Sequence, residues 1–117
     1  MSDNVTDYLR NTENYILSVT NKIEGMKFDK DKLRYDLIPP EVKKWLAEVL
    51  TYGAKKYAPD NWKKIEVERY YAAMERHMVA YQLGEEKDPE SGIHHLIHMM
   101  CNAMFICWLE HHKRNNV

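Results

Sequence analysis

The 117-residue sequence has few of the residues that mark disulfide-bonded proteins or phosphate-binding loops. Its two cysteines, Cys101 and Cys107, are six positions apart, which suits neither a Cys-x-x-Cys metal site nor a secreted disulfide framework. We expect both to be small buried hydrophobic residues in a reducing cytosol. The sequence has four glycines and no Gly-rich phosphate loop, Gly-x-Ser-x-Gly or His-Asp dipeptide. This excludes Walker-type NTPases, α/β-hydrolases and His-Asp phosphohydrolases.

Neither sign of charge predominates, and no apolar run is long. Seventeen basic and eighteen acidic side chains nearly cancel, so no overall field attracts a nucleic acid polymer or a membrane, and any recognition of a polyanion has to be local. No segment approaches the roughly 20 apolar residues of a transmembrane helix. Residues 1–15 alternate polar and apolar side chains without the basic cluster of a signal peptide. These absences predict a cytoplasmic protein of one domain.

Hydrophobic residues recur at helical spacing in four segments, residues 2–24, 40–56, 65–83 and 91–112. No segment carries the alternation of a strand, so the predicted fold is all-α, a four- to five-helix bundle. We expect an N-terminal helical arm over residues 1–25 and the main all-α domain over residues 26–114. Ser91 is the expected N-cap of the last helix.

The last predicted helix is apolar nearly all round. Such a helix lies either in the centre of a bundle or at a subunit interface. A chain of this length buries only about two-thirds of the surface that its unfolded form exposes. We therefore expect a homo-oligomer.

Arg76 and His77 are neighbours within an otherwise apolar stripe of the third predicted helix. A guanidinium group can fork onto phosphate oxygens, and a neutral imidazole can act as a base or a metal ligand. Alternatively, the arginine extends to water beside a histidine that is satisfied within the core. Both interpretations remain open from the sequence.

A second cluster joins an acidic loop to the histidine-rich start of the last predicted helix: Glu85, Glu86, Asp88, Glu90, His94, His95 and His98. His95 and His98 share one helix face. The helix dipole at this end disfavours protonated histidine, which keeps the imidazoles neutral for a ligand, a proton or a hydrogen bond. Together with nearby carboxylates they could bind a divalent ion. The acidic loop could instead be only a solvated surface.

Two further segments are rich in basic and aromatic residues. Residues 50–62, LTYGAKKYAPDNW, bring lysines, tyrosines, Asn61 and Trp62 to one helix end. Aromatic faces stack on bases, and an amide can bind a base edge with two hydrogen bonds. Trp62 could instead fill the core while the lysines are solvated. The loop over residues 26–40 carries Lys, Arg and Tyr between the helices, as functional loops do, but it could equally be a charged linker.

Three stretches together resemble a known family: KFDKDKLRYDLIPP, YGAKKYAPDNW and AAMERHMVAYQLGEEKDPESGIHHLIHMMCNAMF. Over about residues 26–110 the sequence resembles the phage dATP/dGTP diphosphohydrolases, the MazZ-like proteins, which are relatives of the all-α MazG-like nucleotide pyrophosphatases. The resemblance implies an oligomeric helical bundle. It also implies the reaction of a purine (d)NTP with water to give the (d)NMP and pyrophosphate, in the host cytoplasm if the protein is phage-encoded.

This activity, placed on the clusters above, predicts roles for individual residues. A divalent metal, Mg²⁺ or Mn²⁺, is expected on Asp88, His95 and His98. The catalytic candidates are Glu85, Asp88 and His77. The nucleotide is expected to be bound by Lys32, Arg34, Lys56, Tyr57, Asn61, Trp62 and Arg76.

One departure from the family pattern leaves the chemistry open. MazG-like enzymes hold Mg²⁺ through Glu-x-x-Glu on one helix and Glu-x-x-Asp on the next, a pattern that the third and last predicted helices lack. Either Glu48, Glu75, Glu85 and Asp88 assemble the site differently, or histidines bind a softer metal, or catalysis is lost. Loss of catalysis defines an alternative function: a non-catalytic phage nucleotide-binding protein that sequesters a nucleotide-derived immune signal of the host. Three or four converging carboxylates favour hydrolysis, and none or one favours sequestration.

Overall fold

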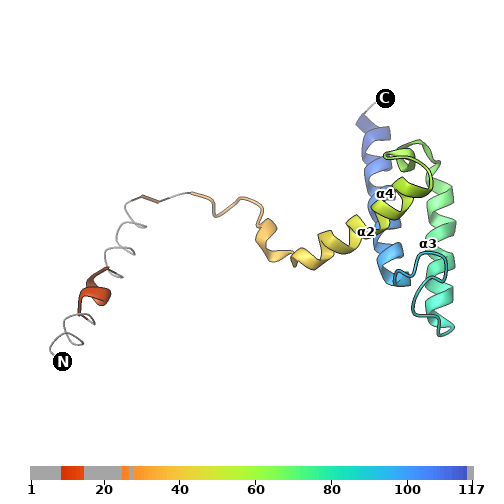
Figure 1. The fold of residues 1–117 in the computed structure, drawn as a ribbon. Helices are drawn as coiled ribbons and strands as arrows, with labels where there is room; N and C mark the ends of the chain where they lie inside the picture. Colours follow the sequence, from red (N-terminus) through yellow and green to blue (C-terminus); the bar gives the residue numbers. More distant parts are fainter. Residues whose placement is uncertain (1–8, 15–24, 27, 116–117) are drawn as a thin grey trace. The chain divides into compact units, whose positions relative to one another are not determined.

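The computed structural model describes residues 9–14, 25–26 and 28–115 (Figure 1). The chain divides into two compact units, Met1–Tyr35 and Asp36–Val117. In the described ranges every regular element is helical, and the only pairing of β type is an isolated bridge between Lys87 and His94. The all-α prediction is therefore confirmed. None of the described helices is long and apolar enough to cross a membrane.

Of the first unit the structure describes residues 9–14, 25–26 and 28–35. Residues 9–14 are α-helical, in agreement with part of the expected N-terminal arm, and the rest of that prediction lies outside the described residues. The described part of residues 25–34 forms turns and irregular backbone, as expected of a loop. A short 3-10 helix, η1 (Tyr35–Leu37), follows it.

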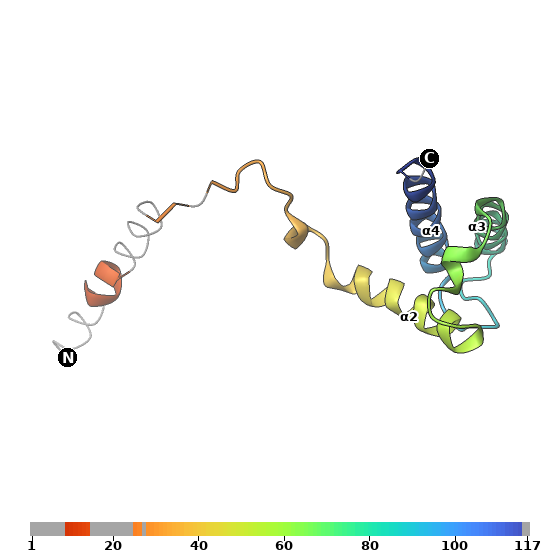
Figure 2. The same cartoon turned by 90° about the horizontal axis from the view of Figure 1, so that it is seen from above.

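Three α-helices and a short 3-10 helix build the second unit: α2 (Pro40–Lys56), η2 (Asn61–Lys64), α3 (Val67–Gln82) and α4 (His95–Asn115). Pro40 occupies the first turn of α2, where its missing N–H leaves no hydrogen bond unmade. Gly84 follows α3 with a φ of 102°, a left-handed conformation that glycine adopts without strain. In Figures 1 and 2, α3 and α4 lie side by side and antiparallel, and the C-terminal half of α2 packs against α4.

The prediction that Ser91 caps the last helix is wrong, because α4 begins at His95. The backbone turns back at Gly92, which has a φ of 73°. The loop is closed by backbone hydrogen bonds, from the Asp88 N–H to the Ile93 oxygen (2.9 Å) and from the His95 N–H to the Glu86 oxygen (3.0 Å). Ser91 is left free to direct its hydroxyl at another side chain.

The core is small and one side of it is polar. The buried hydrophobic residues Val49, Cys101 and Phe105 contact a shell of half-buried ones, Leu46, Leu50, Trp62, Tyr70, Ile93, Ile97 and Met104. Three polar side chains of α4 are equally buried: His95, His98 and Asn102. Spacings of three and four residues place all the buried positions of α4 on one face. The expectation of two buried cysteines holds for Cys101 and is wrong for Cys107, which is exposed.

Candidate functional site

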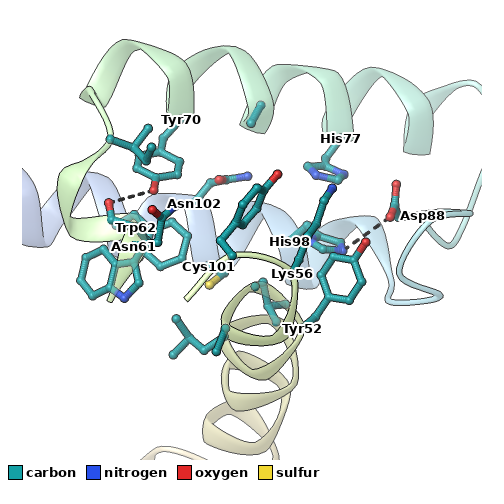
Figure 3. Close-up of a pocket in the computed structure, with 18 of the residues that line it drawn as sticks. Tyr52, Lys56, Asn61, Trp62, Tyr70, His77, Asp88, His98, Cys101 and Asn102 are labelled. Carbon is teal, nitrogen blue, oxygen red and sulfur yellow. Dashed lines mark hydrogen bonds and ion pairs between the residues drawn. The ribbon is translucent and has the colours of Figure 1, made fainter. Parts of the chain in front are cut away.

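A pocket of about 1350 Å³ opens between α2, α3, α4 and the loop over residues 85–94 (Figure 3). It is larger than the roughly 300–1,000 Å³ of ordinary small-molecule sites. The buried polar face of α4 forms its floor, so histidines lie near one end and aromatic residues at the other. A site of this size can accept a ligand with a charged part and an aromatic part.

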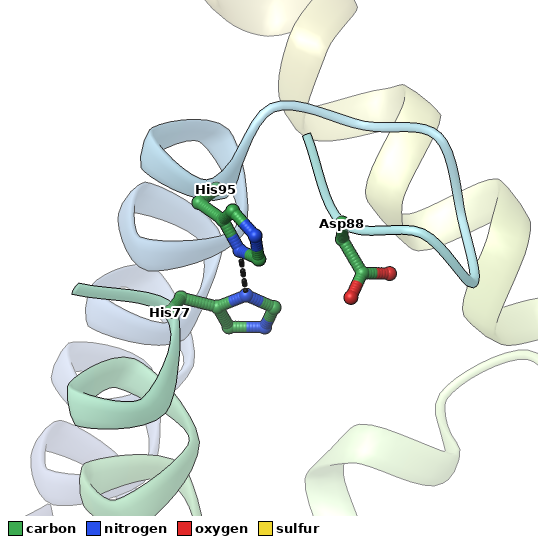
Figure 4. A group of neighbouring side chains, drawn as sticks. All are labelled: His77, Asp88 and His95. Carbon is green, nitrogen blue, oxygen red and sulfur yellow. Dashed lines mark hydrogen bonds between the residues drawn. The ribbon is translucent and has the colours of Figure 1, made fainter. Parts of the chain in front are cut away.

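His77, Asp88 and His95 converge at the polar end, each from a different element (Figure 4). His77 comes from α3, Asp88 from the loop and His95 from the first turn of α4. They offer ligand atoms that all lie within 4.8 Å of one another. The Nδ1 atoms of the two histidines are 2.7 Å apart and share a hydrogen bond. The two rings thus bring nitrogen atoms to one place, and the proton that lies between them has to leave before both Nδ1 atoms can bind one metal ion.

A carboxylate orients the ring of His95. Its Nε2–H donates to Glu85 Oε1 over 2.8 Å, which leaves the Nδ1 lone pair facing His77 and the centre of the cluster. A metal-ligating histidine commonly donates its other ring N–H to a carboxylate in this way. Glu85 therefore fixes the tautomer that a metal ligand requires.

Asp88 is held in place by the loop that carries it. The Ser91 N–H donates to Asp88 Oδ2 over 2.9 Å, and the Ser91 Oγ lies 2.7 Å from His98 Nε2. Burial raises the pKa of Asp88, but the hydrogen bonds from Ser91 outweigh it and hold the pKa below its ordinary value. Asp88 is therefore an ionised, oriented carboxylate at neutral pH.

The two inner histidines are neutral at pH 7. Burial, followed by the neighbouring imidazoles of His98 and His95, lowers the pKa of His77 from its ordinary 6.5 to about 4. His98 stacks on His77 with ring centroids 4.5 Å apart. Burial also lowers the pKa of His98, by more than the nearby Asp88 carboxylate raises it. Neutral imidazoles keep the lone pairs that metal binding needs.

The stability of the metal-free protein should fall as the pH is lowered from 6.5 towards 4. Because the pKa of His77 is depressed in the folded state, the unfolded chain takes up the proton first. The stability that neutral His77 contributes is complete above pH 6.5 and is lost as the pH falls through about 4. Urea unfolding in EDTA at pH 7.0 and 5.0 measures the loss. The loss should be smaller in His77→Gln; an equal loss in that variant contradicts the assignment.

Basic groups line the pocket beside this cluster. Lys56 is ion-paired with Glu90, which also hydrogen-bonds Tyr52. The Glu90 contact raises the pKa of Lys56, so it stays charged. Arg76 also lines the pocket, and no carboxylate of the described residues lies within ion-pair distance of its guanidinium. Arg76 is therefore the more available cation for an anionic ligand.

Aromatic side chains pack on one another at the other end. Trp62 stacks on Phe105 with ring centroids 4.7 Å apart. Trp108 contacts Trp62 edge-on, with ring centroids 5.0 Å apart. The Tyr70 hydroxyl donates to the Trp62 carbonyl oxygen over 2.8 Å. This packing corresponds to the core-filling alternative for Trp62. Tyr57 is well exposed.

Most of the predicted site residues line this one pocket: Lys56, Tyr57, Asn61, Trp62, Arg76, His77, Glu85, Asp88, His95 and His98. Lys32 and Arg34 belong to the first unit and remain a prediction. Within the donor cluster His77 stands where the sequence suggested His98, whose Nε2 is hydrogen-bonded to Ser91 and 4.0 Å from Asp88.

The carboxylates do not form the four-acid arrangement that MazG-like enzymes use. Asp88 is the only acid of the donor cluster in the described part of the chain, and Glu85 acts through His95. Glu75 lines a separate, shallow surface groove on α3, and Glu48 lines neither. Among the described residues one carboxylate, Asp88, joins two histidines, a carboxylate count that favours sequestration by the criterion given above.

Sequence reasoning missed the site contacts of Ser91 and Asn102, and it named Tyr52 only among the aromatic residues of the 50–62 segment. Ser91 was assigned to a helix cap, and Tyr52 and Asn102 have helical spacing that is equally typical of a core. Asn102 differs from a surface asparagine only in being buried on the same face of α4 as His98. That burial depends on the packing of α3 against α4, which the sequence does not give.

Known proteins supply an independent comparison. The family model described as dATP/dGTP diphosphohydrolase, N-terminal, matches residues 22–116. The chain is also 38% identical over 85 residues to a dATP/dGTP diphosphohydrolase of Salmonella phage PMBT28, a match that covers 73% of this chain and 29% of the relative. The chain thus spans less than a third of the length of that relative. No solved structure matches the present chain. Because the family model covers most of the sequence, including the whole pocket, the chain belongs to the dATP/dGTP diphosphohydrolase N-terminal family.

Proposed function

We propose that the chain is a divalent-metal-dependent diphosphohydrolase of purine deoxynucleoside triphosphates, which converts a (d)NTP and water into the (d)NMP and pyrophosphate. Membership of the dATP/dGTP diphosphohydrolase family carries the proposal of hydrolysis, because the single converging carboxylate, Asp88, would by itself favour sequestration. The His77, Asp88 and His95 cluster supplies candidate metal ligands, and it lies in a pocket with Arg76, which has no ion-pair partner among the described residues. The family to which the chain belongs, and a phage relative named dATP/dGTP diphosphohydrolase, support the substrate class.

The donor set suits a transition metal better than magnesium. Two imidazole nitrogens and one carboxylate match the preferences of Mn²⁺, Fe²⁺, Co²⁺ or Zn²⁺, whereas Mg²⁺ prefers oxygen ligands. Of the two ions suggested by the sequence we therefore propose Mn²⁺. Such an ion polarises phosphoryl oxygens and lowers the pKa of a bound water.

The chain's own residues have separate tasks in this proposal. Arg76 binds phosphate oxygens with its planar donor fork, and Lys56 joins it when a phosphate displaces Glu90. Glu85 keeps the ring of His95 in position. Catalysis then rests on alignment and on neutralising charge, as in other phosphoryl transfers.

A direct assay tests the function. The purified chain is incubated with each of the four dNTPs and Mn²⁺ or Mg²⁺, and pyrophosphate release is followed. We expect turnover of dATP and dGTP that is higher with Mn²⁺. Absence of turnover with every triphosphate contradicts the proposal. If a bound nucleotide is then recovered intact, the sequestering alternative is supported.

Arg76→Ala should weaken nucleotide binding more than it lowers stability. Arg76 is exposed and lacks an ion-pair partner among the described residues, so little folding energy depends on its charge. Loss of a charged hydrogen-bond donor to phosphate should raise the Kd about 10-fold or more. Calorimetric titration with dGTP and thermal melting measure the two effects. If the melting temperature collapses while the folded fraction binds normally, Arg76 is structural.

Assembly as a homo-oligomer remains part of the proposal. Large apolar side chains are exposed along α3 and beside the start of α4, namely Met78, Val79, Leu83 and Leu96. A second copy would cover them. Light scattering at several protein concentrations measures the subunit number, and a monomer at all of them contradicts this part. We place the activity in the cytoplasm of a bacterial host, with no nucleic acid polymer or membrane as partner.

A further inference from the structure

Asn102 is a buried polar side chain in the pocket that the proposed chemistry does not use. It is 7% exposed and lies one helical turn beyond His98, on the inward face of α4. In the part of the chain that the structure describes, its amide makes no hydrogen bond. The amide is nevertheless not sealed off, since no fully buried polar atom of the described residues lacks a partner. The hydrogen-bond donors and the acceptor of the Asn102 amide therefore face the pocket.

Nearly all buried polar groups in proteins are hydrogen-bonded, to the protein itself, to ordered water or to a ligand. The Asn102 amide has no such bond within the described chain and opens to the pocket, so its partner there is water or a ligand. Neighbouring Cys101 and Phe105 show that apolar side chains fit this face of α4. A buried polar group without an internal partner calls for a partner from outside the chain.

The position of Asn102 indicates what that partner is. Figure 3 shows Asn102 between the aromatic residues Trp62 and Tyr70 on one side and the histidines on the other. Along α4, Asn102 is about 6 Å from His98, from four residues at a rise of about 1.5 Å each. A nucleotide with its phosphates at the histidines would bring its base to Asn102. We propose that Asn102 binds the hydrogen-bonding edge of the base, an inference that rests on the proposed nucleotide substrate.

The chemistry of the amide suits two kinds of purine. A 6-aminopurine presents an N–H donor at C6 beside a ring-nitrogen acceptor, and a 6-oxopurine presents an oxygen acceptor beside a ring N–H. An amide has one acceptor oxygen and one NH₂ group. Half a turn about its last bond exchanges them, so Asn102 pairs with either base. The hydroxyl proton of Tyr70 is not available to the base or to Asn102, because Tyr70 already donates it to the Trp62 carbonyl.

Three substrates and two variants test the role of Asn102. The kcat/KM of pyrophosphate release is measured with dATP, dGTP and the deoxynucleoside triphosphate of purine itself, which has no group at C6. The wild-type chain should use the unsubstituted purine less well by on the order of 10- to 100-fold. Asn102→Ala should lose a similar factor on dATP and dGTP and little on the unsubstituted purine. Gln82→Ala, an exposed amide that does not line the pocket, should keep the wild-type preference.

Each result decides between distinct explanations. Equal losses on all three substrates in Asn102→Ala give Asn102 a structural role and overturn the inference. A preference that survives in Asn102→Ala, or that disappears instead in Asn61→Ala, places base recognition elsewhere. If Asn102→Ala does not fold, the wild-type preference and Asn102→Ser provide the same comparison. If the wild-type chain cleaves no triphosphate, the proposed function fails separately, and dissociation constants for the same three nucleotides test Asn102.

Discussion

Asp88→Asn and His77→Gln should each reduce divalent-metal affinity and pyrophosphate release by more than about 100-fold. Changes in residues that only orient a metal ligand typically cost 10- to 100-fold. Loss of a ligand itself should exceed that range. The two residues lie on different elements, the loop and α3, and meet only at the donor cluster and at the neighbouring ring of His98. A common loss in both variants would therefore report the cluster and not one local distortion.

Titration with Mn²⁺, followed by electron paramagnetic resonance of the free ion, measures the affinity. Glu86→Gln is the matched control, because Glu86 is an acid of the same loop that does not line the pocket and is exposed. Glu86→Gln should bind Mn²⁺ like the wild type, and circular dichroism should show all three variants to be helical. Unchanged Mn²⁺ binding by Asp88→Asn and His77→Gln would show that these residues do not form a metal site.

Phe105→Ala should lower the free energy of unfolding by about 3–5 kcal/mol, the usual loss for a buried phenylalanine. Phe105 is one of the few buried hydrophobic residues of the described chain and contacts both Trp62 and Tyr70. Small domains have only about 5–15 kcal/mol in total. The variant should therefore be partly or fully unfolded at 37 °C.

Urea denaturation followed by tryptophan fluorescence measures this effect, since Trp62 stacks on Phe105. The control is Leu83→Ala, because Leu83 is 82% exposed. At low protein concentration its change should remain within about 0.5 kcal/mol, as for other surface substitutions. A loss below 1 kcal/mol in Phe105→Ala would mean that the aromatic end of the pocket is not the core of this unit.

Periodicity predicted α2 and α3 to within two residues at each end, because local signals mark those ends. The pattern placed a helix over residues 40–56, and α2 has those bounds since Pro40 suits a first turn. The start of α4 was misplaced by four residues. Ser91 has the residue type of an N-cap, but Gly92 adopts a left-handed conformation. The loop closes through backbone hydrogen bonds between residues that are five and nine positions apart, which the residue type at one position does not encode.

For the candidate site, too, the sequence predicted the residue types but not the contacts that depend on how the helices pack. Residue type and order brought His77, Asp88 and His95 to attention, because these groups are unusual at a helix end or within an apolar stripe. Which histidine joins the cluster depends on the angle at which α3 meets α4, and the sequence does not specify it. Asn102 was missed because an isolated amide in an apolar helix has no distinguishing pattern until its burial is known.

The polar inward face of α4 has a consequence for the lifetime of the protein in a cell. His95, His98 and Asn102 take inward positions that apolar side chains would otherwise fill. The unliganded chain is therefore more often open to proteases, and a bound ligand protects it, by about 2.7 kcal/mol at a concentration of 100 times its Kd. The amount of intact protein should consequently follow the supply of the proposed metal and nucleotide. Limited proteolysis with and without Mn²⁺ and dGTP would make this dependence visible.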